Sequence, residues 1–218
     1  MIVEDTHYNA HDNTRDNTHH TTHDNIHDNN HGKRQEKRQE YKIPGGPTQP
    51  EIVAIVLSKL EIKPGDLVAD IGCGTGTVTA ALAQIAKTVF AIDTREEAIC
   101  CTGVHCLHSG CSNVCLMQGD ARSIIKTLDR VDRAFCGGSK GIDEIITLLY
   151  ARGAVRIVVN AVLLETVMSA MQAIKENGMV CEIIHLQISR STELALRTMF
   201  VPINPVYIIT GTRVDHNS

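Results

Sequence analysis

Short apolar runs alternate with amphipathic stretches along the chain from Tyr41 onward. The runs are rich in β-branched side chains, which is typical of buried strands. Amphipathic helical patterns separate the first five runs, which predicts a parallel sheet with helices on both faces. The predicted strands are Leu67–Ile71, Val89–Ile92, Val114–Met117, Arg133–Cys136, Val155–Val159, Val180–Ile188 and Val206–Thr210.

The last two predicted strands follow each other without a helix between them. The connecting residues 189–205 contain Pro202 and Pro205 and show no helical period. We therefore expect these two strands to pair antiparallel at the edge of the sheet. Ahead of the first strand, Thr48-Gln-Pro-Glu51 has the pattern of a capping box, which predicts a helix extending to about Leu60.

The first 40 residues differ in composition from the rest and cannot supply a core. Seven of the 11 histidines lie at or before His31, His-Asp-Asn recurs three times, and Lys-Arg-Gln-Glu is repeated in tandem at residues 33–40. Such low-complexity polar sequence predicts a disordered extension. Its histidines are candidate transition-metal ligands, but a flexible segment lacks a fixed geometry. We expect one extension, residues 1–40, and one globular domain, residues 41–218.

Composition limits the function classes. The net charge is -4 and charged residues make up 21% of the chain, so neither nucleic acid nor an anionic membrane surface is an expected partner. No apolar stretch is long enough to span a membrane, and acidic residues follow Met-Ile-Val directly, unlike in a signal peptide. The eight cysteines are expected to be reduced thiols. The sequence thus predicts a cytoplasmic protein.

A glycine-rich loop follows the first predicted strand and precedes a predicted helix. It contains Gly72, Gly74 and Gly76, whereas the sixth position of the dinucleotide fingerprint is Thr77, which disfavours NAD and FAD. Asp93 ends the second predicted strand and Asp120 follows the third. The carboxyl ends of parallel strands meet at one edge, so the sequence predicts a crevice for a nucleotide-like ligand.

The segment Asp70-Ile-Gly-Cys-Gly-Thr-Gly76, together with Asp93 and Asp120, resembles the Rossmann-like class of S-adenosylmethionine-dependent methyltransferases. A narrower resemblance covers nearly all of residues 41–211. It includes Pro44–Thr48, Ala91–Ile99, Gly137–Ser139, Asn160–Thr166 and Asn204–Val206, and it is to the decarboxylating cobalt-precorrin-6B C(15)-methyltransferase family of anaerobic cobalamin biosynthesis.

The resemblance implies an α/β fold with a seven-stranded, mostly parallel sheet and an antiparallel last strand. It implies methylation of carbon 15 of cobalt-precorrin-6B with loss of the carbon 12 acetate carboxyl group. It also implies a homo-oligomer, expected to be a tetramer, and a separate carbon 5 methyltransferase. The cofactor is S-adenosyl-L-methionine, contacted by Thr48, Gly72, Cys73, Gly74, Thr75, Gly76, Asp93 and Ala121.

Other candidates rest on the residues themselves. Glu165 and Thr166 follow the fifth strand, where they are candidate catalytic groups or the cap of a helix over 167–176. Lys140, Arg190 and Arg197 are candidates for binding the carboxylates of a corrinoid, because guanidinium forks bind carboxylates bidentately. Asp70 fits either cofactor contact or a structural hydrogen bond.

A second cluster of candidate ligands lies in one predicted helix and the turn after it. Cys101, His105 and His108 fall on one helix face, but no Cys-x-x-Cys pair is present, so we expect no protein-bound metal. Two alternative functions remain open from the residues. One is an RNA or protein methyltransferase, and the other is a non-catalytic metal-binding protein that uses the histidine-rich segment.

Overall fold

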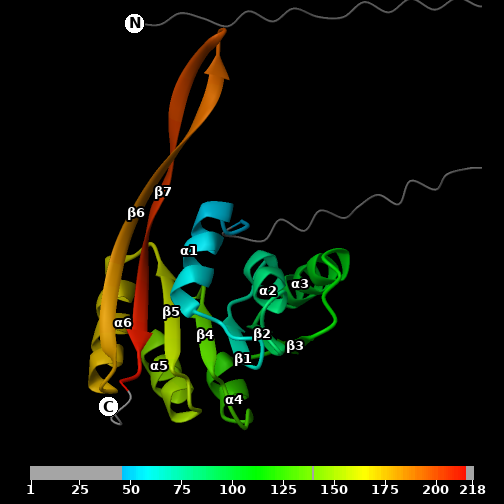
Figure 1. Cartoon of the computed structure of the whole chain (residues 1–218), viewed down its shortest axis with the longest axis vertical. Helices are drawn as coiled ribbons and strands as arrows, with labels where there is room; N and C mark the ends of the chain where they lie inside the picture. Colours follow the sequence, from blue (N-terminus) through cyan, green and yellow to red (C-terminus); the bar gives the residue numbers. More distant parts are fainter. Residues whose placement is uncertain (1–45, 139, 215–218) are drawn as a thin grey trace, which may run out of the picture. The chain divides into compact units, whose positions relative to one another are not determined.

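The computed structural model describes residues 46–138 and 140–214. They form a seven-stranded sheet in the order β3-β2-β1-β4-β5-β7-β6, in which β1 to β5 are parallel and β7 is antiparallel to both of its neighbours (Figure 1). The predicted fold class is confirmed. The strands are β1 (Leu67–Ile71), β2 (Thr88–Asp93), β3 (Val114–Gln118), β4 (Arg133–Cys136), β5 (Arg156–Ala161), β6 (Val180–Leu194) and β7 (Arg197–Thr212).

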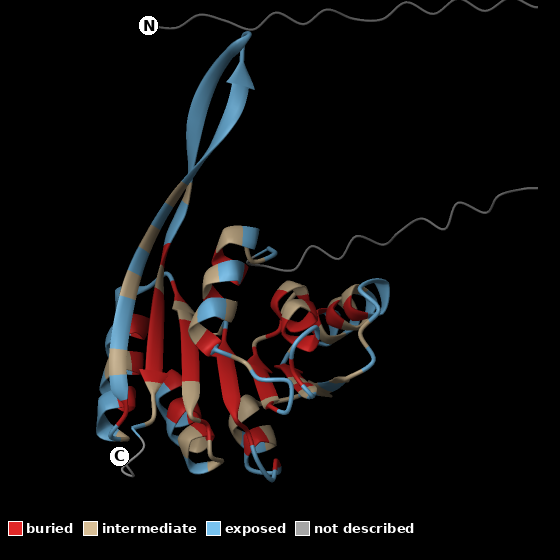
Figure 2. Ribbon diagram, viewed as in Figure 1, coloured by how far each residue is buried: buried red, intermediate tan, exposed pale blue. Residues whose placement is uncertain are grey.

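Helices cover both faces of this sheet, because neighbouring residues of each central strand point to opposite sides. Val68 of β1 and Val158 of β5 pack toward α1 and α2, whereas Ala69 and Val159 pack toward α4, α5 and α6. Figure 2 shows the central strands as the most buried part of the domain. The helices are α1 (Pro50–Leu60), α2 (Thr77–Ala83), α3 (Glu96–His108), α4 (Ala121–Ile125), α5 (Ile142–Ala151) and α6 (Leu164–Glu176).

The start of α1 differs from the predicted capping box. The N-cap is Gln49, which makes no side-chain cap, and Pro50 occupies the first helical position. Glu51 instead accepts two hydrogen bonds from the guanidinium of Arg190, at 3.1 and 2.5 Å. The prediction was wrong because a partner 139 residues away in the sequence takes the carboxylate that a local cap would need. Thr48 is consequently left at the edge of a cavity.

The strands β6 and β7 are much longer than predicted and form a hairpin arm, which we define as residues 189–202. Their pairing continues from Val180↔Thr212 to Leu194↔Arg197, with an irregularity between Leu186 and Ile188. The turn at Ala195 and Leu196 has φ of 49° and 62°. Turns of this kind favour Asn-Gly, so the sequence carried no hairpin signal here. Figure 1 shows the arm extending past the ends of the other strands.

Large apolar side chains are exposed on this hairpin arm, whose ribbon Figure 2 colours as exposed. A two-stranded ribbon with two solvated faces is marginally stable in water, so these side chains need a covering surface. The most exposed ones in and beside the turn are Leu194, Leu196 and Phe200, at 62%, 92% and 70%. The arm is therefore a candidate contact surface.

Two further predictions concern the histidine-rich segment and membrane-spanning helices. The histidine-rich segment, residues 1–40, lies outside the described residues, so its disorder stays a prediction. Within the described part of the chain, no helix has both the length and the apolar character needed to cross a membrane.

Candidate active site

The glycine loop joins β1 to α2 in a conformation that requires glycine at two positions. Gly72 has φ 79° and Gly76 has φ 82°, both in the left-handed region. A Cβ atom on Gly76 would lie 2.7 Å from the Cα of Thr102 in α3. Thr102 also donates a hydrogen bond to the carbonyl of Gly74 at 3.2 Å. Helix α3 thus holds the loop, and the loop leaves the first turn of α2 facing the carboxyl edge of the sheet.

Asp93 ends β2 beside this loop, with 5% of its surface exposed. Its carboxylate accepts hydrogen bonds from the Gly74 backbone N–H at 3.2 Å and the Arg95 backbone N–H at 3.0 Å. The Arg95 guanidinium binds both carboxylate oxygens, at 3.0 and 2.9 Å. Burial raises the pKa of Asp93, but these hydrogen bonds and the Arg95 charge outweigh it, so the pKa lies below its usual value. Asp93 is an anion at neutral pH.

Asp70, in β1, is completely buried under the same loop. Its Oδ2 accepts a hydrogen bond from Thr79 at 2.5 Å, whereas its Oδ1 has no hydrogen-bond partner among the described residues. Burial raises the pKa of Asp70 to about 7, the Thr79 hydrogen bond opposes this, and the charge of Asp93 adds to it. Both interpretations of Asp70 therefore have support, because one oxygen is bonded within the protein and the side chain lines a cavity.

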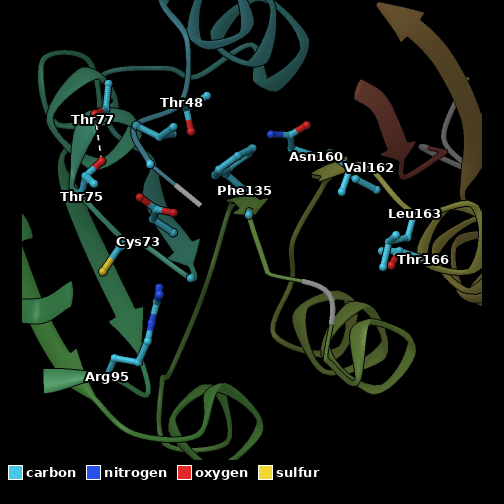
Figure 3. A pocket seen from close by; sticks show the side chains of 17 residues that line it. Thr48, Cys73, Thr75, Thr77, Arg95, Phe135, Asn160, Val162, Leu163 and Thr166 are labelled. Atoms are coloured by element: carbon cyan, nitrogen blue, oxygen red, sulfur yellow. Dashed lines mark hydrogen bonds between the residues drawn. The ribbon is translucent and has the colours of Figure 1, made fainter. Parts of the chain in front are cut away.

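A cavity of about 290 Å³ lies between the glycine loop and the end of β5; we call it the loop cavity (Figure 3). Asp70 and Cys73 line it from the loop side, and Arg95 borders it there. Asn160, Leu163 and Thr166 line the opposite side, and the ring of Phe135 from β4 forms part of its wall. Two strand ends and a helix start thus enclose one space.

Two more cavities adjoin the loop cavity. One, about 250 Å³, shares Gly72 and Arg95 with it and is also lined by Asp93, Ala121 and Lys140. The other, about 240 Å³, shares Thr48 and Asn160 with it and is also lined by Ile203, Asn204 and Val206 of β7. The three share lining residues along the carboxyl ends of the strands, where ligands bind in open α/β sheets, and we call them together the crevice.

The residues predicted to contact a cofactor lie along this crevice. Thr48, Gly72, Cys73, Gly74 and Thr75 line the loop cavity, and Asp93 and Ala121 line the cavity beside it. Gly76 directly follows Thr75 and is the N-cap of α2. Asp120 lines the same cavity as Asp93 and Ala121, and its carboxylate caps α4 and pairs with Arg122 at 2.9 Å. Its charge is satisfied within the protein.

The predicted acceptor-side residues are scattered. Thr166 is buried and lines the loop cavity, whereas Glu165 is exposed in the first turn of α6, which begins at Leu164 rather than at residue 167. Lys140 lies in the cavity beside Asp93. Arg190 is bound to Glu51, and Arg197 begins β7 at the outer end of the hairpin arm. Their substrate roles remain predictions.

The sequence analysis missed Phe135 and Asn160 as site residues. Phe135 was assigned only to a buried strand, and it is 2% exposed, although its ring reaches the loop cavity. Asn160 is a polar residue near the carboxyl end of β5, directly after the apolar run Ile157–Val159. A polar side chain at that position of a buried parallel strand is the signal that could have identified it, because ligands bind at these ends.

The cysteines and histidines of α3 do not gather into a site. Among the described residues, no three His, Cys, Asp or Glu side chains are placed to hold a metal ion. Cys100 is exposed, whereas Cys106 is buried. In the glycine loop, burial raises the pKa of Cys73 to about 12, so this thiol is protonated at neutral pH and is a poor nucleophile.

Comparison with known proteins gives consistent matches over the described domain. Residues 39–213 match the precorrin methyltransferase domain family. The chain is 46% identical over 176 residues to the probable cobalt-precorrin-6B C(15)-methyltransferase (decarboxylating) of Methanosarcina mazei, covering 78% of this chain and 96% of that protein. It is 39% identical to the protein of the same name from Saccharolobus solfataricus, covering 76% and 88%.

Solved structures show the same fold. The crystal structure of precorrin-8W decarboxylase from Methanobacterium thermoautotrophicum is 38% identical and has a TM-score of 0.74, covering 79% of this chain and 94% of that one. Precorrin-6y C5,15-methyltransferase from Geobacter metallireducens is 29% identical, with a TM-score of 0.72 and coverage of 77% and 91%.

Proposed function

Because the chain belongs to the precorrin methyltransferase family, we propose that it methylates carbon 15 of cobalt-precorrin-6B and removes the carboxyl group of the carbon 12 acetate, in cobalamin biosynthesis. Relatives of this name match nearly their whole length. The observation that carries the proposal is the crevice, with an anionic Asp93 in one cavity and the side chains of Phe135, Asn160 and Thr166 in the next. Neither an RNA or protein acceptor nor a purely metal-binding role is favoured.

We infer that S-adenosyl-L-methionine is the cofactor. When bound, it supplies an activated methyl group on a sulfonium. Asp93 would accept hydrogen bonds from the ribose hydroxyls, and the backbone at Ala121 would border the adenine. The loop from Gly72 to Gly76 and the side chain of Thr48 would enclose the amino-acid part.

The residues present fit such a ligand. Asp70 offers a buried carboxylate oxygen without a partner at the loop cavity, which suits a ligand carrying a positive charge. Asp93 is held ionised, as an acceptor of two hydroxyl hydrogen bonds must be. The Arg95 guanidinium already binds both carboxylate oxygens of Asp93, so the ligand would replace some of these hydrogen bonds.

The protein's contribution to the reaction is positioning and exclusion of water. Thr166 and Phe135 would border the acceptor carbon, and Glu165 lies one residue from Thr166 at the rim. The peripheral carboxylates of the corrinoid are proposed to bind Lys140, Arg190 and Arg197. Arg190 would release Glu51 or bind both carboxylates, and Arg197 would move from its present position. Cobalt in this scheme is part of the substrate.

We propose a homo-oligomer, a tetramer by family resemblance, assembled through the hairpin arms. Support comes from the apolar side chains of the arm, which have no cover within the described chain. A separate carbon 5 methyltransferase is the proposed partner, since one relative is named for both carbons and others for carbon 15 alone. The proposed location is the cytoplasm, with neither nucleic acid nor membrane as a partner.

Incubation of the purified protein with cobalt-precorrin-6B and S-adenosylmethionine tests the function. Product mass spectrometry should show a gain of about 14 Da for the methyl group and a loss of about 44 Da for carbon dioxide. Titration calorimetry with S-adenosylhomocysteine tests the cofactor separately. Cofactor binding without any change in corrinoid mass would reject this substrate while retaining the methyltransferase assignment.

A further inference from the structure

The acceptor end of the loop cavity is built from neutral side chains. Phe135 of β4, Asn160 of β5 and Thr166 of α6 line the same space (Figure 3). Among the described residues that line the loop cavity and the cavity continuing to β7, Arg95 is the one cation. Arg95 is bound to Asp93 at the cofactor side, and in Figure 3 it lies beside Cys73, across the cavity from Asn160.

Asn160 is fixed in this position by the sheet. It pairs with Ile208 of β7 and lies two residues after Val158, on the same face of β5. Val158 packs under α1, so Asn160 emerges where that cover ends, and it borders both cavities. Its Oδ1, which can only accept, is buried without a hydrogen-bond partner among the described residues, and Figure 3 shows the amide nitrogen, which can donate to a carboxylate, turned toward the cavity. A rigid strand thus presents one amide whose hydrogen-bonding capacity is incompletely used.

We infer that Asn160 binds the acetate carboxylate that is lost, and that the absence of a cation beside it promotes the loss; this rests on the proposed function. The bond from the acetate methylene carbon to the carboxylate breaks, and its electron pair enters the conjugated ring. The ring accepts it because carbon 15 has gained a methyl cation. Carbon dioxide leaves without an oxidant or a proton donor.

Charge explains why neutral partners suit this step. The carboxylate loses its negative charge as carbon dioxide forms, so a guanidinium would stabilise the starting carboxylate more than the transition state. An amide N–H orients the group with a weaker hydrogen bond than a charged donor makes. The apolar wall from Phe135 reduces solvation of the carboxylate.

The test measures how products divide between methylated only and methylated with loss of carbon dioxide. Asn160→Leu keeps the side-chain size and should lower decarboxylation relative to methyl transfer by about tenfold, with S-adenosylhomocysteine affinity unchanged. Asn204→Leu is the matched control, because Asn204 lines only the cavity toward β7. It should weaken corrinoid binding at most and leave the division of products as in the wild type.

A second variant tests the charge argument. Leu163→Lys places a cation at the exposed edge of the loop cavity, since Leu163 is 57% exposed and lines it. We expect tighter corrinoid binding and slower loss of carbon dioxide. Faster loss with this variant, or an unchanged product division with Asn160→Leu, would overturn the inference. If the wild type produces neither mass change, the proposed function fails instead, and the two failures are therefore distinguishable.

Discussion

At the scale of single residues, the site is defined by three carboxylates in three different environments. Asp93 is buried but ionised by its donors, Asp70 is buried with one donor, and Asp120 is half-exposed and paired with Arg122. Sequence position alone makes these strand-end acids look alike. Asp93 and Asp120 each bind an arginine fork and two backbone N–H groups and differ in burial, whereas Asp70 has one hydroxyl donor.

Replacing Asp93 with Ala should weaken S-adenosylmethionine binding by about 1.5–3 kcal/mol, the range for hydrogen bonds to a charged group. The fold should persist, because the Arg95 side chain is 40% exposed and can be solvated when its partner is lost. Titration calorimetry measures the affinity. Glu96→Ala, at an exposed acid in the first turn of α3, is the matched control. Unchanged affinity in a folded Asp93 variant would remove the ribose role.

Asp70 predicts a pH dependence of stability with a defined sign. Its folded pKa, about 7, lies above the unfolded value of 3.8, so the folded state binds the proton more tightly. The contribution to stability is therefore full below about pH 4 and is lost as the pH rises to about 7. Asp70→Asn should abolish this decline and raise the free energy of unfolding at pH 8 by about 1–3 kcal/mol.

Cofactor affinity should respond in the opposite direction. An ionised Asp70 attracts a positively charged ligand, so wild-type affinity should rise from pH 6 to pH 8, and the Asn variant should bind more weakly with little pH dependence. Denaturant unfolding and calorimetry at both pH values measure the two effects. If wild type and variant follow parallel stability curves, Asp70 does not titrate in this range.

At the scale of elements, the hairpin arm is the feature that the sequence did not reveal. Residues 189–205, with their two prolines, were predicted only as a connection between strands, yet Pro202 pairs with Ser189 within the ladder. Replacing Leu196 and Phe200 with Ser should dissociate the oligomer, because burying a large apolar side chain contributes about 1.5–3 kcal/mol. Light scattering after gel filtration measures the mass, and calorimetry should show unchanged cofactor affinity.

A control for this prediction lies on α3. Leu107 is 76% exposed and far from the arm in sequence, so Leu107→Ser should leave the oligomer intact. Dissociation by the α3 variant, with none by the arm variant, would transfer the contact surface from the arm to α3. A wild-type monomer would contradict the proposed assembly altogether.

At the scale of the whole molecule, the match to the precorrin methyltransferase family covers residues 39–213, and the boundary at Tyr41 stays a prediction. Deleting residues 1–40 should leave the thermal midpoint and cofactor affinity nearly unchanged, because such polar, low-complexity sequence buries little surface. Nickel or zinc retention should fall with the loss of seven histidines. A large drop in the midpoint would show that the segment packs on the domain.

The sequence by itself determined the order of strands and helices, the glycine loop and the acid that ends β2. These depend on local physics: apolar periodicity, the left-handed φ that glycine tolerates, and the shared direction of parallel strands. They can be inferred from short windows of the chain. The resemblance to a methyltransferase family followed from the same motifs.

Only the tertiary structure decided which side chains meet. Glu51 and Arg190 are 139 residues apart, and no local pattern indicates that they pair. Asn160 faces Thr48 and Phe135 because three strand and helix ends converge at one cavity. The arm depends on cross-strand pairing around a turn that lacks a turn sequence. Side-chain contacts of this kind depend on how elements that are distant in the sequence pack together. They form only when the whole domain has folded, so no short window of the sequence predicts them.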